Sequence, residues 1–210
     1  MQLPRRSFFR HLLAIAALAL ALPAFAQGGG YTLVQPPQQT DNPAKIEVLE
    51  FFSYGCPHCY EFSGPLSAWV AKLPADVVFK RVPVSFGRAA WANVGRLYHA
   101  LEATGDLAKL DTDVFKAINE QRVDLYNEKP MLEWLAKKGV NTQKFSEAYR
   151  SFGVQSKGSR GDQMAQAYRI GGVPALAING KYLLEAREPS EMFALADKLI
   201  AKERAERSKK

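Results

Sequence analysis

The pattern of apolar and polar positions predicts an α/β chain that begins with a strand, a helix and a second strand. Residues 46–52 form a short apolar run with β-branched and aromatic side chains, which is typical of a buried central strand. Apolar residues between Phe62 and Leu73 then recur at helical spacing. Residues 76–86 predict the second strand, which ends at Pro83. A strand, helix and strand in this order predict a crossover unit with two parallel strands.

From residue 88 to about residue 169 the pattern is helical, with few strand candidates. Five segments show helical spacing: 89–105, 110–122, 128–140, 142–154 and 158–170. Gly105, Gly139 and Gly153 occupy places typical of glycines that end helices. We therefore expect an all-helical insertion over residues 88–169.

Two short apolar runs follow this region, and Asn179 and Gly180 join them. An Asn-Gly pair between two such runs favours a tight hairpin. Residues 187–206 then predict a closing helix with Ser190 as its N-cap. The predicted order is therefore strand, helix, strand, helical insertion, hairpin and helix.

The N-terminus has the pattern of an export signal. Arg5, Arg6 and Arg10 precede an apolar run over residues 12–22, and a site of small residues follows. The run is too short to span a bilayer. We expect residues 1–26 to be a signal peptide, with the general secretory route and the twin-arginine route both open.

After the signal, residues 27–45 are rich in Gly, Pro and Gln, which predicts a flexible lead-in with a short edge strand at residues 31–34. The formal net charge of +7 is concentrated at the two ends of the chain, in the signal and in the tail over residues 202–210. Because the remaining body is close to neutral, we expect no nucleic-acid partner, which requires a basic face within the fold. We expect the basic tail to end the last helix and then to fray in solvent.

The chain has two cysteines, Cys56 and Cys59, in the stretch EFFSYGCPHCYEF. Structural zinc needs four ligands, and after the signal only His58 and His99 could join the cysteines, so we expect no metal, whether a structural zinc or a zinc or copper to be delivered. A static disulfide that closes so short a loop constrains the unfolded chain little. A C-x-x-C pair between a strand and a helix is instead typical of a dithiol that cycles between oxidised and reduced forms.

The expected place of Cys56 at a helix N-terminus predicts its chemistry. Unpaired backbone N–H groups and the helix dipole stabilise a thiolate there. Cys59 should lie one turn inside the helix, buried and less acidic. Pro57 fits the first helical turn, and His58 can offer a positive charge or an N–H to the thiolate. We therefore expect Cys56 to be the exposed, attacked sulfur and Cys59 the resolving one.

The stretches EVLEFFSYGCPHCYEF and GGVPALAING resemble those of the DsbA-type periplasmic thiol-disulfide oxidoreductases. The resemblance implies a thioredoxin fold with an inserted all-helical domain: a first thioredoxin part over 27–87, the insertion over 88–169, and a second part with the basic tail over 170–210. It also implies disulfide donation to reduced, unfolded exported polypeptides in the periplasm, and reoxidation by a membrane quinone-linked partner of the DsbB type. We expect a monomer without a cofactor.

Three further site residues are implied by the resemblance alone. Pro174 matches a cis proline beside the dithiol, where the backbone of Val173 can pair with a substrate strand. Glu50 matches a buried acid beneath the dithiol that moves the proton of the resolving thiol. Lys80 is a candidate partner for Glu50, although a solvated lysine is favoured. His99 is expected to be a partly exposed helix residue.

Two alternative functions remain open at this point. Disulfide isomerases and reductases share this fold and dithiol, but they typically add a dimerisation domain or a membrane anchor. A periplasmic chaperone that binds unfolded chains without redox chemistry would keep its full activity in a variant that lacks the dithiol.

Overall fold

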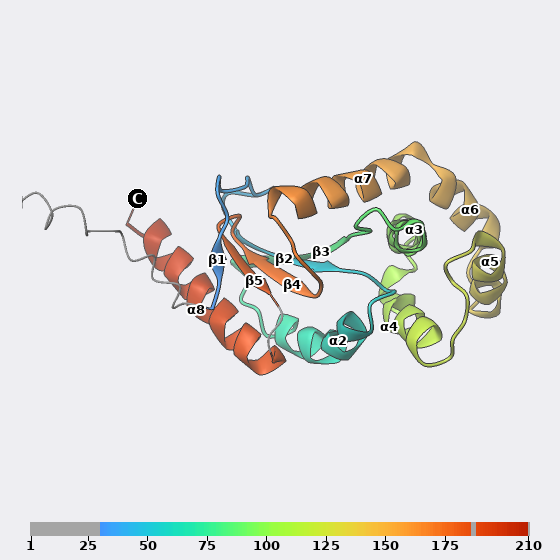
Figure 1. Ribbon diagram of the computed structural model, residues 1–210, viewed down its shortest axis with the longest axis horizontal. Coiled ribbons are helices and arrows are strands. Elements are labelled where there is room, and N and C mark those ends of the chain that lie inside the picture. The colour runs from blue at the N-terminus through green and yellow to red at the C-terminus, as the bar shows by residue number, and fades with distance from the viewer. Residues whose placement is uncertain (1–29, 186–187, 210) are drawn as a thin grey trace, which may run out of the picture. The chain divides into compact units, whose positions relative to one another are not determined.

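The computed structural model describes residues 30–185 and 188–209, and the predicted signal peptide lies outside these ranges. Five strands form one sheet in the order β1-β5-β4-β2-β3 (Figure 1). The strands are β1 Thr32–Leu33, β2 Ile46–Phe52, β3 Val77–Pro83, β4 Ala175–Ile178 and β5 Tyr182–Glu185. The helices are α2 Pro57–Val70, α3 Ala89–Thr104, α4 Leu107–Asn119, α5 Glu128–Lys137, α6 Thr142–Arg150, α7 Phe152–Ala167 and α8 Pro189–Arg207. The elements follow one another in the predicted order.

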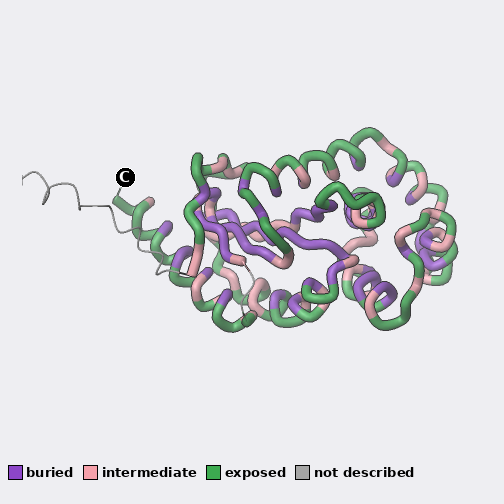
Figure 2. The backbone as a smooth tube through the Cα atoms, viewed as in Figure 1, coloured by how far each residue is buried: buried purple, intermediate pink, exposed green. Residues whose placement is uncertain are grey.

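Strand β2 lies inside the sheet, between β4 and the edge strand β3. It pairs in parallel with β3, as predicted, and antiparallel with β4. All of its residues are buried, and Figure 2 shows the inner strands of the sheet as buried. A strand that is covered on both faces is mostly apolar, which explains the pattern in the sequence. Its two acidic residues, Glu47 and Glu50, are each paired with a basic residue of β3.

Helices cover both faces of the sheet (Figure 1). On one face, Phe62 of α2 and Met192 of α8 pack in a cluster with Val48 of β2. On the other face, Ala165 of α7 packs in a cluster with Leu49, the next residue of β2. Successive side chains of a strand point to opposite faces, so β2 supplies both clusters in turn.

A third apolar cluster joins the end of β2 to the helical region. It contains Phe52 and Tyr54 together with residues of α3, α4, α5 and α6. Cys56 and Cys59 belong to the same cluster. The dithiol therefore lies where the sheet meets the helices of residues 89–150.

The boundary between the last two helices of this region differs from the prediction. Gly105 has a φ of 85° and ends α3, as expected for a glycine in that place. Gly153, in contrast, lies in the first turn of α7 and ends no helix. Ser151 is the N-cap of α7, and its hydroxyl accepts a hydrogen bond from the backbone N–H of Val154. The prediction of a helix end at Gly153 is therefore wrong, because the Ser151 cap starts the next helix two residues earlier.

The C-terminal helix differs from the prediction at its start. Its N-cap is Glu188 and Pro189 is its first residue, so Ser190 is not the cap. The helix ends at Arg207, one residue beyond the predicted end at residue 206. Arg204 donates two hydrogen bonds to Asp76 at 2.7 and 2.9 Å, which holds this end of α8 against the turn before β3.

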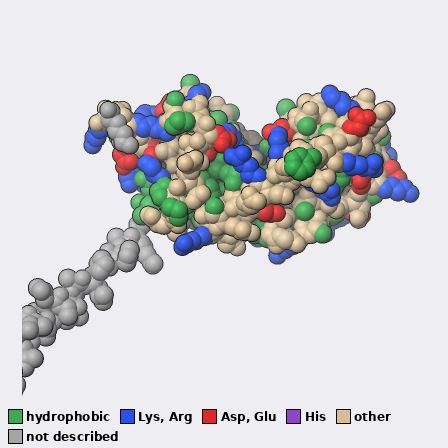
Figure 3. All heavy atoms as spheres, turned by 90° about the horizontal axis from the view of Figure 1, so that it is seen from above, with side chains coloured by type: hydrophobic (Ala, Val, Ile, Leu, Met, Phe, Trp, Pro, Cys, Tyr) green, Lys and Arg blue, Asp and Glu red, His purple; other side chains and the backbone are tan. Residues whose placement is uncertain are grey.

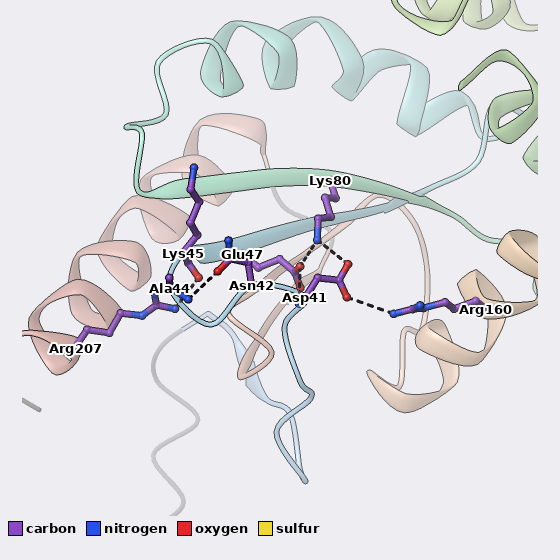
Figure 4. Close-up of polar contacts among 8 residues, drawn as sticks. All are labelled: Asp41, Asn42, Ala44, Lys45, Glu47, Lys80, Arg160 and Arg207. Carbon is purple, nitrogen blue, oxygen red and sulfur yellow. Dashed lines mark hydrogen bonds and ion pairs between the residues drawn. The ribbon is translucent and has the colours of Figure 1, made fainter. Parts of the chain in front are cut away.

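The lead-in is tied to the body of the protein, although its composition predicted a flexible segment. The backbone N–H of Gln38 donates to the carbonyl oxygen of Gly180 at 2.8 Å. Asp41 accepts from Lys80 of β3 at 2.8 Å and from Arg160 of α7 at 3.4 Å (Figure 4). One carboxylate thus joins the lead-in, the edge strand β3 and a helix residue 119 positions further along the chain.

The surface is mixed in charge. On the face that Figure 3 shows, Lys and Arg side chains are interspersed with Asp and Glu. Within residues 30–185 and 188–209, no helix has both the length and the apolar character needed to cross a membrane.

Candidate active site

The dithiol lies at the start of α2. Cys56 is the N-cap residue, with extended backbone angles of −99° and 116°, and Pro57 is the first helical residue. Proline is well placed there because its missing N–H would have no partner in the first turn. Cys59 lies in the first turn of the same helix. The predicted placement of these three residues is confirmed.

Two aromatic side chains pack closely on the backbone of Gly55, directly before Cys56. A Cβ atom on Gly55 would lie 2.9 Å from Nε1 of Trp91 and 3.1 Å from the hydroxyl of Tyr126. The first separation is shorter than real Cβ contacts and the second is tighter than most of them, so a larger residue here would displace the aromatic side chains. Trp91 lies in the first turn of α3 and Tyr126 lies just before α5, so the helical region forms one wall of the site.

Both cysteines are free thiols in the structure, and both are buried. Cys59 has no exposed surface, as expected, whereas Cys56 is 7% exposed and not as open as predicted. The pKa of Cys56 is lowered to about 6, because the Cys59 thiol donates a hydrogen bond to it and backbone N–H groups and the charge of His58 also favour the thiolate. Burial and the neighbouring thiolate raise the pKa of Cys59. The pair therefore holds one charged and one protonated sulfur.

His58 is exposed between the two cysteines. Its Nδ1 atom lies 3.1 Å from Oε2 of Glu61 in the next turn of α2. The side chain thus contacts Glu61, while its positive charge and its backbone N–H contribute to the lowered pKa of Cys56. Glu61 is a neighbour of the site that sequence reasoning missed, although three residues along a helix place two side chains on one face.

The loop before β4 lies beside the dithiol. The peptide bond between Val173 and Pro174 is cis, as predicted, and a second cis bond precedes Pro36. The carbonyl oxygen of Val173 lies 3.5 Å from Sγ of Cys56. Residues 117 positions apart in the sequence therefore meet at the attacked sulfur.

Glu50 is fully buried in β2, as the resemblance implied. Its partner is Arg81, whose Nε donates to Oε2 of Glu50 at 2.5 Å. Lys80 binds Asp41 and Glu47 instead, so the pairing of Lys80 with Glu50 is wrong. Burial raises the pKa of Glu50, against the opposing effect of Arg81. The parallel register places Arg81 opposite Glu50, and no signal in the sequence distinguishes Arg81 from the adjacent Lys80.

Arg81 also binds the helical region. Its Nη1 donates to both carboxylate oxygens of Asp111 in α4, at 2.7 and 2.9 Å. Its guanidinium lies over the ring of Phe52, 3.8 Å from the centroid. The hydroxyl of Tyr54 donates to the same carboxylate of Asp111 at 2.5 Å. A polar network beneath the dithiol thus connects β2, β3 and α4.

His99 is buried at 8% exposure, which corrects the expectation of a partly exposed residue. It lines a cavity of about 530 Å³ between β3, α3 and α7, together with Tyr168 and Met164. Neither cysteine lines this cavity. Within the described ranges, no group of three or more His, Cys, Asp or Glu side chains is placed to hold a metal ion.

The sequence of the chain is similar to those of known proteins. A family model described as a DSBA-like thioredoxin domain matches residues 47–199. The thiol:disulfide interchange protein DsbA of Pseudomonas aeruginosa is 38% identical over 207 residues, covering 93% of this chain and 98% of that protein. DsbA of Bordetella parapertussis is 40% identical over 205 residues, covering 93% and 97%.

The fold of the chain is similar to the folds of solved DsbA structures. The crystal structure of Pseudomonas aeruginosa DsbA superposes with a TM-score of 0.82 at 40% identity, covering 87% of this chain and 96% of that chain. The oxidoreductase NmDsbA1 of N. meningitidis gives a TM-score of 0.77 at 26% identity, covering 87% and 95%. Relatedness at this level implies substrate proteins and a partner that reoxidises the dithiol. The chain therefore belongs to the DSBA-like thioredoxin family, and it is a thiol-disulfide oxidoreductase with the predicted thioredoxin fold.

Proposed function

We propose that the protein donates the Cys56–Cys59 disulfide to reduced, unfolded exported polypeptides in the periplasm. The observation that carries this proposal is the contrast between the two sulfurs: the pKa of Cys56 is about 6, and burial raises that of Cys59. A stabilised thiolate is a good leaving group, so a disulfide that contains it is readily transferred to other thiols. The same contrast favours a disulfide donor over a reductase.

The transfer takes two steps. A substrate thiolate attacks Sγ of Cys56, the Cys56–Cys59 bond breaks, and the Cys59 sulfur leaves and takes up a proton. A second substrate thiolate then attacks the substrate sulfur of this mixed disulfide and releases Cys56 as a thiolate. The substrate loses two electrons, and the dithiol gains them.

Val173 and Pro174 are proposed to bind the substrate chain. The carbonyl oxygen of Val173 lies 3.5 Å from Sγ of Cys56, so a backbone paired with this loop would hold its own cysteine beside the attacked sulfur. An extended peptide that pairs through its main chain is bound largely independently of its sequence. This property suits a protein that acts on many unfolded clients.

Reoxidation is proposed to occur through a membrane quinone-linked partner of the DsbB type. A partner disulfide forms a mixed disulfide with Cys56, and Cys59 must then lose its proton to attack. Glu50 is the proposed acceptor of this proton, because it is buried and its charge acts on Cys59. The protein is proposed to act as a monomer.

The two cysteines can be tested as trapping variants. In a Cys59→Ala variant whose Cys56 has first been oxidised to a mixed disulfide with glutathione, a thiolate of a reduced, unfolded client displaces the glutathione thiolate. The resulting disulfide between Cys56 and the client should persist, because Cys59 is no longer present to resolve it. The Cys56→Ala variant should trap none, because its remaining thiol is buried and protonated. Non-reducing electrophoresis and mass spectrometry measure both. Equal trapping by the two variants would contradict the assignment of roles.

A further inference from the structure

The pairing between Arg81 and Glu50 is half complete. Arginine can bind a carboxylate with two parallel hydrogen bonds, one from Nε and one from the Nη atom on the same side of the guanidinium. Here Nε of Arg81 donates to Oε2 of Glu50 at 2.5 Å. Within the described residues, Nη2 of Arg81 and Oε1 of Glu50 are both buried without a hydrogen-bond partner. The second bond of the pair is thus absent, although both of its atoms are unoccupied.

Asp111 holds the other end of the guanidinium. Both of its carboxylate oxygens accept from Nη1 of Arg81, at 2.7 and 2.9 Å. The hydroxyl of Tyr54 fixes the same carboxylate, and the ring of Phe52 supports the plane of the guanidinium. Arg81 is therefore held from two sides, and rotation toward Glu50 would break its bonds to Asp111.

We propose that Asp111 is a positioning residue for the resolving thiol: by holding Nη1 of Arg81, it keeps Oε1 of Glu50 free to accept the proton of Cys59. This inference rests on the proposed role of Glu50 in reoxidation. In that step the S–H bond of Cys59 breaks and an O–H bond forms at Oε1. The Cys59 thiolate attacks the Cys56 sulfur, the Cys56–Cys59 bond forms, and the partner sulfur leaves as a thiolate with both electrons of the broken bond.

The charges around Glu50 support this assignment. The charged and titratable groups that act on it or respond to its charge are Arg81 from β3, Asp111 from α4, Tyr98 from α3 and Cys59 from α2. Tyr54, from the loop after β2, contacts Asp111. Burial raises the pKa of Glu50, Arg81 lowers it, and Asp111 raises it. Asp111 thus weakens the hold of Arg81 on Glu50 both by geometry and by charge, which keeps Glu50 a better base.

The test measures the intramolecular attack of Cys59. Reduced protein is mixed with excess oxidised glutathione at a series of pH values between 4 and 8. Samples taken at intervals are quenched with strong acid. Mass spectrometry then follows the decay of the glutathione adduct on Cys56. In the Asp111→Asn variant, we expect Arg81 to form its second hydrogen bond to Glu50. The acid limb of the plot of decay rate against pH should then move to lower pH by about 0.5 to 1 pH unit, which is less than the shift that a new charge in direct contact causes.

The matched control is Asp113→Asn, two positions along the same helix, where Asp113 binds Lys138 at 2.7 Å. Its profile should coincide with that of the unchanged protein. In a Glu50→Gln background, Asp111→Asn should cause no further shift. Circular dichroism and urea unfolding establish that each variant is folded. If Asp111→Asn does not fold, Asp111→Glu is measured instead, and it should keep the acid limb of the rate profile where it lies in the unchanged protein.

The outcomes separate the two ideas. If Glu50→Gln leaves the acid limb unchanged, Glu50 is not the proton acceptor, and both ideas are wrong. If Glu50→Gln changes the limb and Asp111→Asn does not, only the role of Asp111 is overturned. A limb that moves equally in the presence and in the absence of Glu50 would also overturn it, because the effect would not pass through Glu50.

Discussion

Cys56 and Cys59 are three residues apart in one helix, yet their sulfurs meet different surroundings. Cys56 is the N-cap, where backbone N–H groups without helical partners favour a negative charge. Cys59 is surrounded by the apolar cluster that joins the sheet to the helical region. A difference of one helical turn therefore separates an anionic sulfur from a neutral one.

This difference predicts how the thiols react with an alkylating reagent. Because only the thiolate reacts, the labelling rate of Cys56 in the reduced protein should rise through a midpoint near pH 6 and level off by pH 8. Cys59 should stay unlabelled over this range. Peptide mass spectrometry after timed iodoacetamide treatment measures both rates. A midpoint near the ordinary thiol value would show that the helix start does not stabilise the charge.

The sequence predicted the chemistry of the dithiol because its determinants are local. The N-cap, the proline and the histidine follow one another in the chain, and their effect on Cys56 needs no distant residue. The partner of Glu50 could not be chosen in the same way, since Lys80 and Arg81 are adjacent and only the register of β3 decides which of them faces Glu50. The burial of His99 depends on α7, which packs on α3 from far along the chain.

The contact between helix α7 and strand β3 depends on one glycine. A Cβ atom on Gly161 would lie 2.5 Å from the backbone oxygen of Pro83, and neither backbone can yield easily. In the same helix, a Cβ atom on Gly158 would meet nothing within 4 Å. The two glycines therefore have opposite roles: Gly161 permits close packing, and Gly158 only weakens the helix.

Alanine at these positions gives a matched pair of tests. Gly161→Ala should lower the free energy of unfolding by about 1–3 kcal/mol, as overpacking does. Gly158→Ala should raise it by about 0.5–1 kcal/mol, because alanine favours the helix. Urea unfolding of both variants at one pH measures the two changes. Similar effects of the two substitutions would contradict the close packing of α7 on β3.

The elements themselves were predicted well where the chain gave a periodic signal. The strand over Ile46–Phe52 and the helix behind Cys56 match the structure closely, because long apolar patterns outweigh local ambiguity. Element ends were harder to predict. At Ser151 and Gly153, one residue favours a helix start and the other a helix end, and only the cap bond to Val154 decides between them.

The charge on Cys56 connects the redox state of the protein to its stability. The ordinary thiol pKa is 9.0, and the folded value is about 6. The reduced protein thus gains stability as pH rises from 6 toward 9, and this gain is lost as pH falls through 6. The oxidised protein has no Cys56 charge and lacks this contribution.

The stability of the reduced form relative to the oxidised form should therefore increase between pH 5 and pH 8, by on the order of 2 kcal/mol. Paired urea titrations of the two forms at each pH measure the difference. Groups that titrate equally in both forms cancel in this comparison. If the difference between the two forms is the same at both pH values, the charge on Cys56 does not contribute to folding.

The family and the fold were predicted from about thirty residues in two stretches, and the comparisons confirm both. What the sequence left out is how distant segments are joined. The basic end of α8 and the Gly-rich lead-in both have compositions typical of free termini. Each is held by contacts with residues far away in the chain. Arg204 of α8 pairs with Asp76, and Asp41 of the lead-in pairs with Arg160.

The attachment of the lead-in also imposes an order on folding. Gln38 binds Gly180, and Asp41 binds a residue 119 positions further on (Figure 4). Strand β2 likewise lacks its neighbour β4 until all the helices between them have been made. The lead-in is synthesised first among the described residues, but it can make these contacts only after the segment around Gly180 has been synthesised. A chain cut short before β4 would expose β2 along one whole edge, so an incomplete chain should be recognisable to proteases and chaperones as unfinished.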